Sequence, residues 1–382
     1  MEPVCVMLAG VGGYGRIHIN GLLCETGKKR VKIVGAVDPY PAGDGYARLI
    51  SEGIPVYASI PELYAHHSPS LAIICSPTPF HAEQAIYCLE HGSHVLVEKP
   101  IAPTVNAAEA MIRARDAARR ELVVGYQWCF DDTLCKLKEE VRAGLYGAPK
   151  ALRAIVLWPR DEAYYRRGIG WAGKRFTADG RAVFDNVASN ATAHYLMNML
   201  WIAGYGENGT DIEDVFACAA RANDIETFDS VCLKAVLTNG ASITFAASHA
   251  IARCESLEPT FSYIFEQAEA SYSAQGQRES RLHIKTADGR SRDMGNIAAD
   301  ESALRKVWKT LDIMEGRIPN LCPAELAIGH TKTMEMIDQK IGGQIMAFPS
   351  ERIQRDGALR FVPGLSDTLF KFYQSMTLPD SL

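Results

Sequence analysis

Three glycines near the N-terminus have the spacing of a dinucleotide-binding turn. Gly10, Gly12 and Gly15 form a GxGxxG pattern, which encloses Gly13 and Tyr14, within AGVGGYGRIH. The pattern follows an apolar run typical of a buried strand and opens a helical pattern, the context in which such glycines bind phosphate. Gly10 would permit the tight turn, Gly12 would let a pyrophosphate approach the backbone, and Gly15 would let helix and sheet pack closely. The pattern predicts that a dinucleotide binds at a helix N-terminus, where unpaired N–H groups favour an anion. A glycine-rich turn that binds nothing is the alternative.

A carboxylate follows the second predicted strand. Asp38 ends the apolar run 31–37, about twenty residues beyond the glycines, where an acidic residue binds the ribose 2′-hydroxyl of NAD. The same carboxylate would repel a 2′-phosphate, and the next residues, Pro39 and Tyr40, supply no arginine. The sequence therefore favours NAD over NADP.

Aromatic and basic side chains alternate over residues 158–175. The substrate-binding candidates in this stretch are Trp158, Arg160, Tyr164, Tyr165, Arg166 and Trp171. Aromatic faces stack on the C–H side of a sugar ring, and the arginine fork binds carboxylates with two hydrogen bonds. We therefore expect a lid for a sugar or cyclitol, with or without an acid group. His249, in SITFAASHAIA, is a further candidate for the same cleft. A solvated loop or oligomer contact, and for His249 a packed strand residue, are the alternatives.

The apolar pattern predicts two domains that would position these residues. Up to residue 127, short apolar runs alternate with helical patterns, which is typical of a parallel sheet covered on both faces in a doubly wound Rossmann fold. The expected strands are 4–9, 31–37, 71–75, 94–97 and 122–126, and the expected helices are 14–25, 79–91 and 105–119.

Beyond residue 127, successive strands with turn signals favour a large, mainly antiparallel sheet. The expected strands are 150–158, 214–222, 230–237, 242–249, 261–266 and 269–274, and the expected helices are 130–143, 189–202 and 323–341. We therefore predict α/β plus α+β: an NAD-binding Rossmann domain over 1–127 and a substrate-binding and oligomerisation domain over 128–382. An alternative placement for the helix 323–341 is against the first domain. The tail from Ala347 either covers a neighbouring subunit or hangs free.

The composition excludes several classes of protein. The chain has 382 residues, 47% hydrophobic and 22% charged, with a net charge of -5, so it can bury a large core and offers no basic footprint for nucleic acid. No apolar run has membrane-spanning length, and the start lacks the basic region of a signal peptide. The ten cysteines lack repeated CxxC spacing, so we expect reduced thiols in a cytoplasmic protein and no metal site.

Two further segments carry a family resemblance. Residues 76–104, SPTPFHAEQAIYCLEHGSHVLVEKPIAPT, and residues 124–130, VGYQWCF, together with AGVGGYGRIH closely resemble the Gfo/Idh/MocA oxidoreductases, named for glucose–fructose oxidoreductase and inositol dehydrogenase. The resemblance spans the N-terminal domain and the helix near 190–204, and HVLVEKP is its most specific part. It implies an adenosine and pyrophosphate side lined by Ser76, Pro77, Thr78 and His81.

The resemblance also implies a nicotinamide side. It assigns this side to the EKP motif, Glu98, Lys99 and Pro100, and places Gln127 beside the nicotinamide. In similar enzymes the lysine reaches the nicotinamide ribose and the reacting hydroxyl, and the proline peptide can be cis. Lys99 comes just after strand 94–97, and the carboxyl ends of parallel strands point at the ligand crevice. A lysine near a cationic nicotinamide would have its pKa lowered and could relay a proton. An exposed strand-end lysine is the alternative.

A second family signature is altered here. It reads roughly DxGxHxxD running into LLRWLLG, and this chain has NATAHYLMNMLWIAG. His194 aligns with the family histidine and Asn190 with the family aspartate, so on a helix the two would share one face. His194, with an ordinary pKa of about 6.5, is the predicted acid/base. Asp185 would supply the missing carboxylate if the chain loops back. A histidine satisfied in the domain interface and a capping Asp185 are the alternatives.

Together, these residues and motifs predict an NAD(P)-dependent oxidoreductase that moves a hydride between nicotinamide and a secondary alcohol or ketone. The expected substrate is a small polyhydroxylated molecule, a sugar, cyclitol or sugar acid, and the expected assembly is a homodimer or homotetramer, as in similar proteins. Two alternatives stay open. One is a redox-neutral, NAD-dependent enzyme that cleaves glycosides or epimerises. The other is a non-catalytic dinucleotide-binding regulator, which Asn190 motivates.

Overall fold

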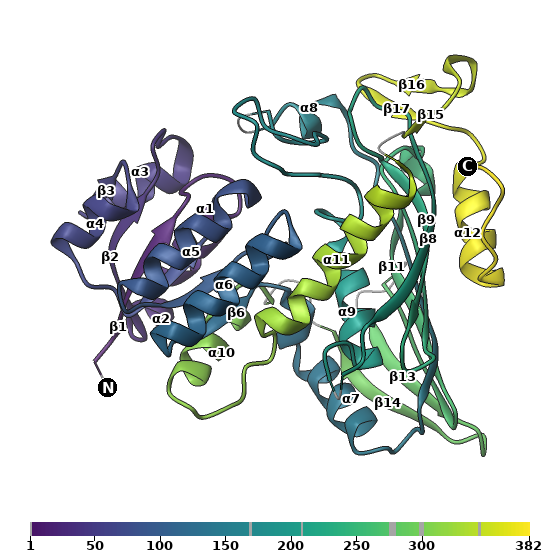
Figure 1. Cartoon of the computed structure of the whole chain (residues 1–382), viewed down its shortest axis with the longest axis horizontal. Helices are drawn as coiled ribbons and strands as arrows, with labels where there is room; N and C mark the ends of the chain where they lie inside the picture. The colour runs from purple at the N-terminus through teal and green to yellow at the C-terminus, as the bar shows by residue number, and fades with distance from the viewer. Residues whose placement is uncertain (1, 168–169, 208, 275–279, 298–301, 343–344) are drawn as a thin grey trace. The chain divides into compact units, whose positions relative to one another are not determined.

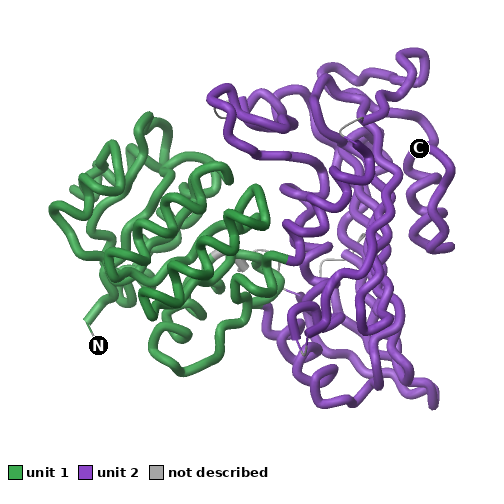
Figure 2. Tube along the Cα trace, viewed as in Figure 1, with its two compact units in different colours: residues 1–130, 299–328 green, residues 131–298, 329–382 purple. Residues whose placement is uncertain are grey.

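The computed structural model describes residues 2–167, 170–207, 209–274, 280–297, 302–342 and 345–382. The chain divides into two compact units, Met1–Phe130 with Ala299–Ile328, and Asp131–Ala298 with Gly329–Leu382 (Figure 2). The first unit therefore takes in a late segment, 299–328, that the sequence placed in the second domain. A helix in this segment buries its apolar face on the first unit.

The first unit is built on a six-stranded parallel sheet in the order β3-β2-β1-β4-β5-β6 (Figure 1). Its strands are β1 Val4–Ala9, β2 Val31–Val37, β3 Val56–Tyr57, β4 Leu71–Ile74, β5 His94–Val97 and β6 Leu122–Val124. β4 and β6 are buried along their whole length, as strands covered on both faces must be. The strand order reverses between β1 and β4, which is where doubly wound sheets bind dinucleotides.

The helices of the first unit partly match the expected ones. They are α1 Gly15–Leu22, α2 Glu25–Lys28, α3 Gly43–Ser51, α4 Ile60–His66, α5 His81–Glu90, α6 Val105–Ala118 and α10 Ser302–Met314, with short 3₁₀ turns η1 Thr78–Phe80 and η2 Gln127–Phe130. The helix predicted over 14–25 ends early, because Cys24 leaves the helical conformation and its sulfur caps α2. The sequence missed β3, α3, α4 and α10.

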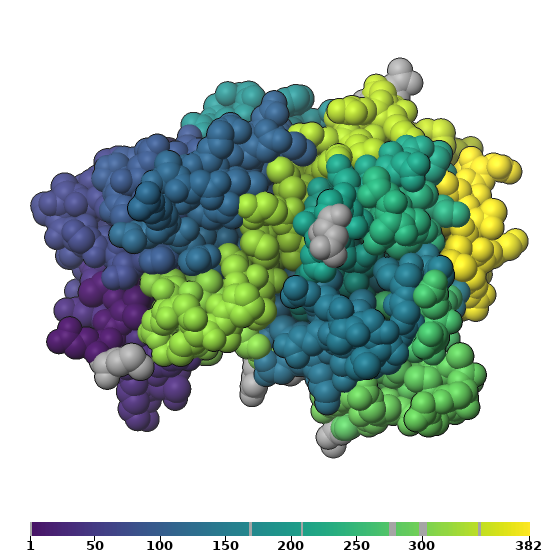
Figure 3. All heavy atoms as spheres, turned by 60° about the horizontal axis from the view of Figure 1, so that its bottom comes forward, coloured from purple at the N-terminus to yellow at the C-terminus, as the bar shows by residue number. Residues whose placement is uncertain are grey.

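The returning helix α10 completes the first unit. It packs on α1, β5 and η2. The approach to α1 is close, since a Cβ built on Gly21 would lie 2.3 Å from a methyl carbon of Leu304. In Figure 3 the yellow-green residues of this part of the chain lie against purple and blue residues of the N-terminal part.

The second unit is built on a nine-stranded sheet in the order β14-β13-β12-β11-β7-β10-β9-β8-β15. Its strands are β7 Pro149–Leu157, β8 Ile212–Arg221, β9 Ser230–Leu237, β10 Ser242–Ser248, β11 Leu257–Phe265, β12 Ala268–Ser273, β13 Arg281–Thr286, β14 Ser291–Asn296 and β15 Met346–Ala347. All neighbours are antiparallel except the pairs β7–β10 and β8–β15. The predicted combination of a Rossmann sheet and a large, mainly antiparallel sheet is confirmed.

The second unit also holds α7 Asp132–Arg142, α8 Glu162–Tyr165, α9 Ala193–Ala203 and α12 Leu365–Ser375, the short turns η3 Arg253–Glu255 and η4 Ser350–Arg352, and a hairpin of β16 Gln354–Asp356 and β17 Leu359–Phe361. The helix α11 Ala324–Lys340 begins in the first unit and ends in the second. The helix α9 starts at Ala193 instead of Ser189, so Asn190 precedes it in a turn and does not lie on its face. None of the helices in the described residues is both long and apolar enough to cross a membrane.

The C-terminal tail packs on its own sheet, which neither predicted alternative anticipated. Leu365, Leu369 and Phe372 of α12 form a buried cluster with Ile155 of β7 and Cys232 of β9. Figure 1 shows α12 on the side of the sheet opposite α9. The tail acts as a third layer of this unit because its helix has an apolar face to bury.

Candidate functional site

The glycine-rich turn lies between the end of β1 and α1. Gly10 has a φ of +89°, and a Cβ there would lie 2.9 Å from the carbonyl oxygen of Cys75. A Cβ on Gly15 would lie 2.1 Å from the carbonyl oxygen of Gly10. At Gly12 and Gly13, by contrast, no heavy atom in the described part of the chain lies within 4 Å of such a Cβ. Two glycines are thus required by internal packing, and two border open space that can receive an anion.

Asp38 closes β2 beside this turn. Its two carboxylate oxygens accept the backbone N–H groups of Val11, at 3.1 Å, and of Tyr40, at 3.0 Å. These bonds fix the carboxylate at the end of β2, the strand next to β1 on one side of the switch point. The turn, the N-terminus of α1 and Asp38 together fit a bound dinucleotide.

The loop after β4 is tied to the loop after β5. The buried His81 ring lies 2.8 Å from the carbonyl oxygen of Ser76 and 2.9 Å from that of Pro100. Ser76 also donates to Gln84 at 2.6 Å, and Thr78 opens the 3₁₀ turn that leads into α5. The Lys99–Pro100 peptide bond is cis, and Lys99 is half-buried directly after β5. The residues that the family resemblance implied therefore form one connected strand-end segment.

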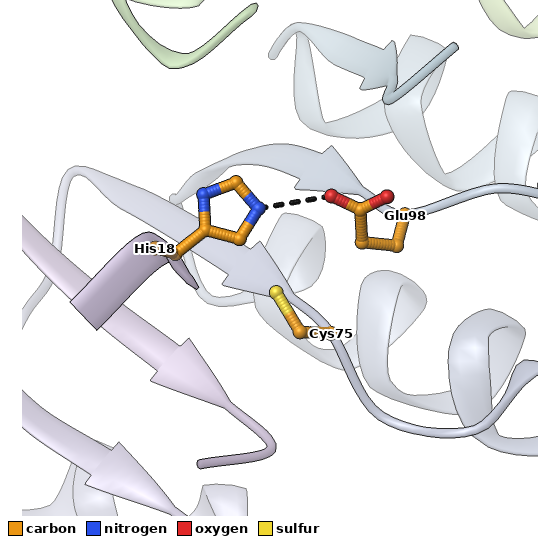
Figure 4. Close-up of side chains that lie close together, drawn as sticks. All are labelled: His18, Cys75 and Glu98. Atoms are coloured by element: carbon orange, nitrogen blue, oxygen red, sulfur yellow. Dashed lines mark hydrogen bonds and ion pairs between the residues drawn. The ribbon is translucent and has the colours of Figure 1, made fainter. Parts of the chain in front are cut away.

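Glu98 is turned into a buried network beneath that segment. Its Oε1 lies 2.9 Å from Nε2 of His18 and accepts a hydrogen bond from Nζ of Lys306, on α10 (Figure 4 shows His18, Glu98 and Cys75). Burial by itself would raise the pKa of Glu98, but the Lys306 ammonium and the bond from His18 outweigh it and hold that pKa well below its usual range. Burial lowers the pKa of His18, so its ring is neutral and Nε2–H donates to Glu98.

Lys306 was missed at the sequence level. The segment that carries it, SALRKVWKTLDIM, was not predicted as a helix. The sequence did contain a signal for this lysine. Lys306, Thr310 and Ile313 follow one another at i, i+4 and i+7, which is the spacing of one helix face, and all three are buried. A charged residue on such a face needs a buried partner, which here is Glu98.

The same place offers three potential metal ligands, although the sequence predicted no metal site. Ligand atoms of His18, Cys75 and Glu98 lie within 4.8 Å of one another. Oε1 of Glu98 already binds Lys306 and His18, and burial raises the pKa of the Cys75 thiol well above its usual value. The Lys306 ammonium already neutralises the Glu98 carboxylate, as a metal cation would otherwise do. We therefore describe the cluster as an ion pair and assign no metal to it.

In the second unit, part of the predicted lid forms an aromatic and basic cluster. Nδ1 of His249 lies 2.7 Å from the carbonyl oxygen of Trp158, and the rings of His249 and Tyr164 lie 5.4 Å apart. Burial lowers the pKa of His249 to about 3, so this ring is neutral at physiological pH. Residues 168–169 of the predicted lid lie outside the described residues.

Two guanidinium groups lie against these rings. Arg160 lies 5.6 Å from the ring centre of Trp158 and 5.3 Å from that of Tyr164. Arg167 lies 3.5 Å from the ring centre of Tyr164 and 4.9 Å from that of Trp171. Both charges are therefore held against aromatic faces, and Arg167 also donates to the carbonyl oxygen of Tyr164.

Two further predicted members of the lid differ in exposure, and the ring of one of them, Tyr165, lies 5.2 Å from that of Tyr164. Arg166 has 79% of its side chain exposed and pairs with Glu162 one turn earlier. Tyr165 is the opposite case, because its phenol is buried and burial raises its pKa well above the usual value. Arg167, another basic residue of the predicted stretch 158–175, lies in the cluster, whereas Arg166 pairs with Glu162.

Asp185 loops back to Asn190. One carboxylate oxygen accepts the side-chain amide of Asn190 at 2.9 Å, and the other accepts the backbone N–H of Gly173 at 2.7 Å. Asp185 is only 5% exposed, so its carboxylate holds the amide in a fixed orientation. His194 lies four residues after Asn190, in the first turn of α9.

Comparisons with known proteins concern the first unit and the fold of the chain. Residues 4–126 match the model of the Gfo/Idh/MocA oxidoreductase family, described as having an NAD-binding Rossmann fold. The chain is 31% identical over 161 residues to an inositol 2-dehydrogenase of Rubrobacter xylanophilus, a match that covers 42% of this chain and 45% of the relative. It is 30% identical over 149 residues to a 1-carboxy-3-chloro-3,4-dihydroxycyclohexa-1,5-diene dehydrogenase of Comamonas testosteroni, covering 39% and 38%. The chain thus matches less than half the length of these relatives.

Among solved structures, a similar fold is that of the WlbA dehydrogenase of Chromobacterium violaceum in complex with NADH and UDP-GlcNAcA. The TM-score is 0.73 with 22% identity, and the match covers 91% of this chain and 96% of that one. An oxidoreductase of Agrobacterium radiobacter in complex with NAD+, L-tartaric acid and magnesium matches with a TM-score of 0.70 and 16% identity, covering 90% and 98%. At these identities the likeness concerns the fold. Residues 4–126, within the first unit, are thus similar to the NAD-binding domain of the Gfo/Idh/MocA oxidoreductase family.

Proposed function

We propose that this protein is an NAD-dependent dehydrogenase that oxidises a secondary alcohol of a small polyhydroxylated substrate, or reduces the matching ketone. The observation that carries the proposal is the position of Lys99. It lies at the carboxyl end of β5, on the β4–β6 side of a sheet whose β1 turn and Asp38 fit a dinucleotide. Relatives by sequence are named dehydrogenases, which supports the same chemistry.

The proposed cofactor is NAD and not NADP. Asp38 is held beside the glycine turn by two backbone N–H groups, so its carboxylate is positioned to accept hydrogen bonds from a ribose diol. A 2′-phosphate at that place would meet this negative charge and be repelled. A bound NAD supplies the hydride acceptor, and the protein supplies orientation and proton transfer.

The proposed proton-handling residues are Lys99 and His194. Lys99 would hold the substrate hydroxyl and take its proton while the carbon is oxidised. His194 would act as the second acid/base, with Asn190 as its neighbour in the substrate site. Asp185 binds the amide of Asn190. In this proposal Asp185 takes the place of the carboxylate that the family resemblance implies at residue 190.

The proposed substrate is a sugar, cyclitol or sugar acid. The cluster of Trp158, Tyr164 and Trp171 offers aromatic faces for a sugar ring, and Arg160 and Arg167 offer forks for a carboxylate. Two similar proteins have names that contain an acidic sugar ligand or a carboxylated ring. These observations favour the sugar acid within the class.

The test is to mix the purified protein with NAD or NADP and a candidate substrate, and to follow absorbance at 340 nm. The matched neutral and acidic sugars are glucose and glucuronate, and myo-inositol is the cyclitol. We expect NADH to form with NAD, faster with a uronate than with the neutral sugar. If the cofactor copurifies with the protein and substrate is converted without net formation of NADH, the result would instead indicate the redox-neutral cycle. Binding of NAD without any conversion would indicate a regulator. Equal affinity for glucose and glucuronate would exclude the proposed preference for an acidic substrate.

A further inference from the structure

A lysine that the proposed mechanism does not use is buried beneath the nicotinamide side of the first unit. Lys306 is 0% exposed, and its Nζ donates to Oε1 of Glu98. Taking an ammonium and a carboxylate out of water is costly, and the attraction between them repays the cost only when the geometry is good. Such a pair therefore needs a reason beyond stability alone.

The contacts of Lys306 join three separate strand ends. Besides Glu98 after β5, its Nζ lies 3.5 Å from the hydroxyl of Tyr14, in the glycine turn after β1, and 3.4 Å from the carbonyl oxygen of Gly125, after β6. It also lies 4.5 Å from the ring centre of Tyr14. The hydroxyl of Tyr14 in turn lies 3.4 Å from Oε1 of Gln127, to which it donates.

The site is shaped to admit this ammonium. A Cβ on Gly125 would lie 3.2 Å from Nζ of Lys306 and 3.2 Å from Oε2 of Glu98. Any side chain at residue 125 would crowd the ion pair, so glycine leaves the room in which Lys306 reaches the backbone. His18 adds a neutral hydrogen bond to the same carboxylate at 2.9 Å, so the network remains balanced in charge.

The strand order places this network under one half of the dinucleotide. In a doubly wound sheet the two nucleotides lie on either side of the switch point, here between β1 and β4. Asp38, after β2, marks the adenosine side, so the nicotinamide belongs to the side of β4, β5 and β6. Glu98 and Gly125 follow the last two of these strands, and Lys99 is the next residue after Glu98.

We propose that Lys306 is a positioning residue for the nicotinamide half of the cofactor site, holding Tyr14, the Glu98–Lys99 backbone and the Gly125–Gln127 segment in one arrangement. The inference rests on the proposed function, because it presupposes a nicotinamide cofactor. Lys306 does not touch the reacting atoms. It acts by fixing the groups that do, as a preorganised site requires.

The test compares a ligand that has a nicotinamide with one that lacks it. The main variant is the pair Lys306→Met and Glu98→Gln, which removes both charges together, since Lys306→Met alone would leave a buried carboxylate unpaired. Tyr14→Phe is the second variant, because it breaks one link and leaves the ion pair intact. Lys309→Met, on the same helix, is the matched control. Binding of NADH and of ADP-ribose to each protein is measured by calorimetry.

We expect the double variant to bind NADH about tenfold more weakly, equivalent to ~1.4 kcal/mol, and ADP-ribose within about twofold of the unchanged protein. Tyr14→Phe should weaken NADH binding by about threefold and spare ADP-ribose, and Lys309→Met should change neither. Equal losses for both ligands, or no loss for either, in a folded double variant would overturn the inference. If that variant does not fold, Tyr14→Phe decides by the same comparison. If the unchanged protein binds neither ligand, the proposed function falls and this inference falls with it.

Discussion

Asn190 stands at the position where the family resemblance implies a carboxylate, and the structure shows which residue binds its amide. A carboxylate can accept a proton and stabilise an imidazolium, whereas an amide can do neither. The Asp185 carboxylate is buried and accepts hydrogen bonds from the side-chain amide of Asn190 and from the backbone N–H of Gly173. The Asp185 carboxylate is therefore bound to the amide of Asn190, which lies four residues before His194 in the chain.

Lys99 carries the proposed chemistry, so its removal gives the first prediction. We expect Lys99→Met to lower turnover by a factor on the order of 10² or more, because a positioned proton-transfer group contributes about that much. Binding of NADH should change little, since the turn and Asp38 are untouched. Stopped-flow or steady-state rates at 340 nm and a binding titration measure the two quantities.

The control for this prediction is Lys32→Met, which removes an exposed lysine from β2. It should leave both turnover and NADH binding as they are. Undiminished turnover in Lys99→Met would exclude Lys99 from the mechanism and leave the proposed chemistry without its main residue.

At the scale of elements, the strand–turn–helix unit of β1 and α1 separates packing from binding. Gly10 and Gly15 are needed because a side chain at either place would collide with backbone. Gly12 borders open space, so a methyl group there would collide with nothing in the residues that the structure describes. The two kinds of glycine should therefore respond differently to substitution.

We predict that Gly12→Ala folds with a free energy of unfolding within about 0.5 kcal/mol of the unchanged protein, yet binds NADH at least about tenfold more weakly, because its methyl group takes the place of the pyrophosphate. Gly10→Ala should instead lose about 1–3 kcal/mol of stability, since it combines a positive φ with a clash against Cys75. Denaturant unfolding and NADH titration distinguish the two effects. A Gly12→Ala protein with normal NADH affinity would contradict the role given to this turn.

At the scale of the whole molecule, each unit is completed by a segment from late in the chain. The segment 299–328 returns to the first unit and brings Lys306, and α12 covers one face of the sheet of the second unit. These late segments are structural parts of their units and not appendages. Stability should therefore depend on residues far from the proposed chemistry.

Phe372 of α12 gives the test at this scale. It is 2% exposed in the cluster with Ile155 and Cys232, so we expect Phe372→Ala to lower the free energy of unfolding by about 3–5 kcal/mol through lost burial and a cavity. Phe370, two residues earlier on the same helix, is 41% exposed, and Phe370→Ala should stay within about 0.5 kcal/mol. Similar midpoints for both variants in urea unfolding would show that α12 does not stabilise the sheet.

Much of this protein could be predicted from local patterns. Strands such as 4–9, 31–37 and 94–97 match the structure to the residue, because a strand buried on both faces is a continuous apolar run bounded by turns. The conformation of the glycine turn and the place of Asp38 at the end of β2 were predictable for a similar reason, since both follow from the spacing of residues along the chain. The sequence alone also pointed to the cluster of Trp158, Arg160 and Tyr164.

The tertiary structure alone decided which distant residues meet. The pairing of Lys306 with Glu98 joins residues 208 apart in the chain, and the bond from Asp185 to Asn190 depends on a turn that delays α9 until Ala193. The choice of Arg167 over Arg166 for the aromatic cluster was likewise set by packing. Periodicity reports only which face of an element is apolar. It contains no information on which partner a buried charge finds, because that partner is chosen by the folded chain as a whole and by the cost of leaving the charge unpaired.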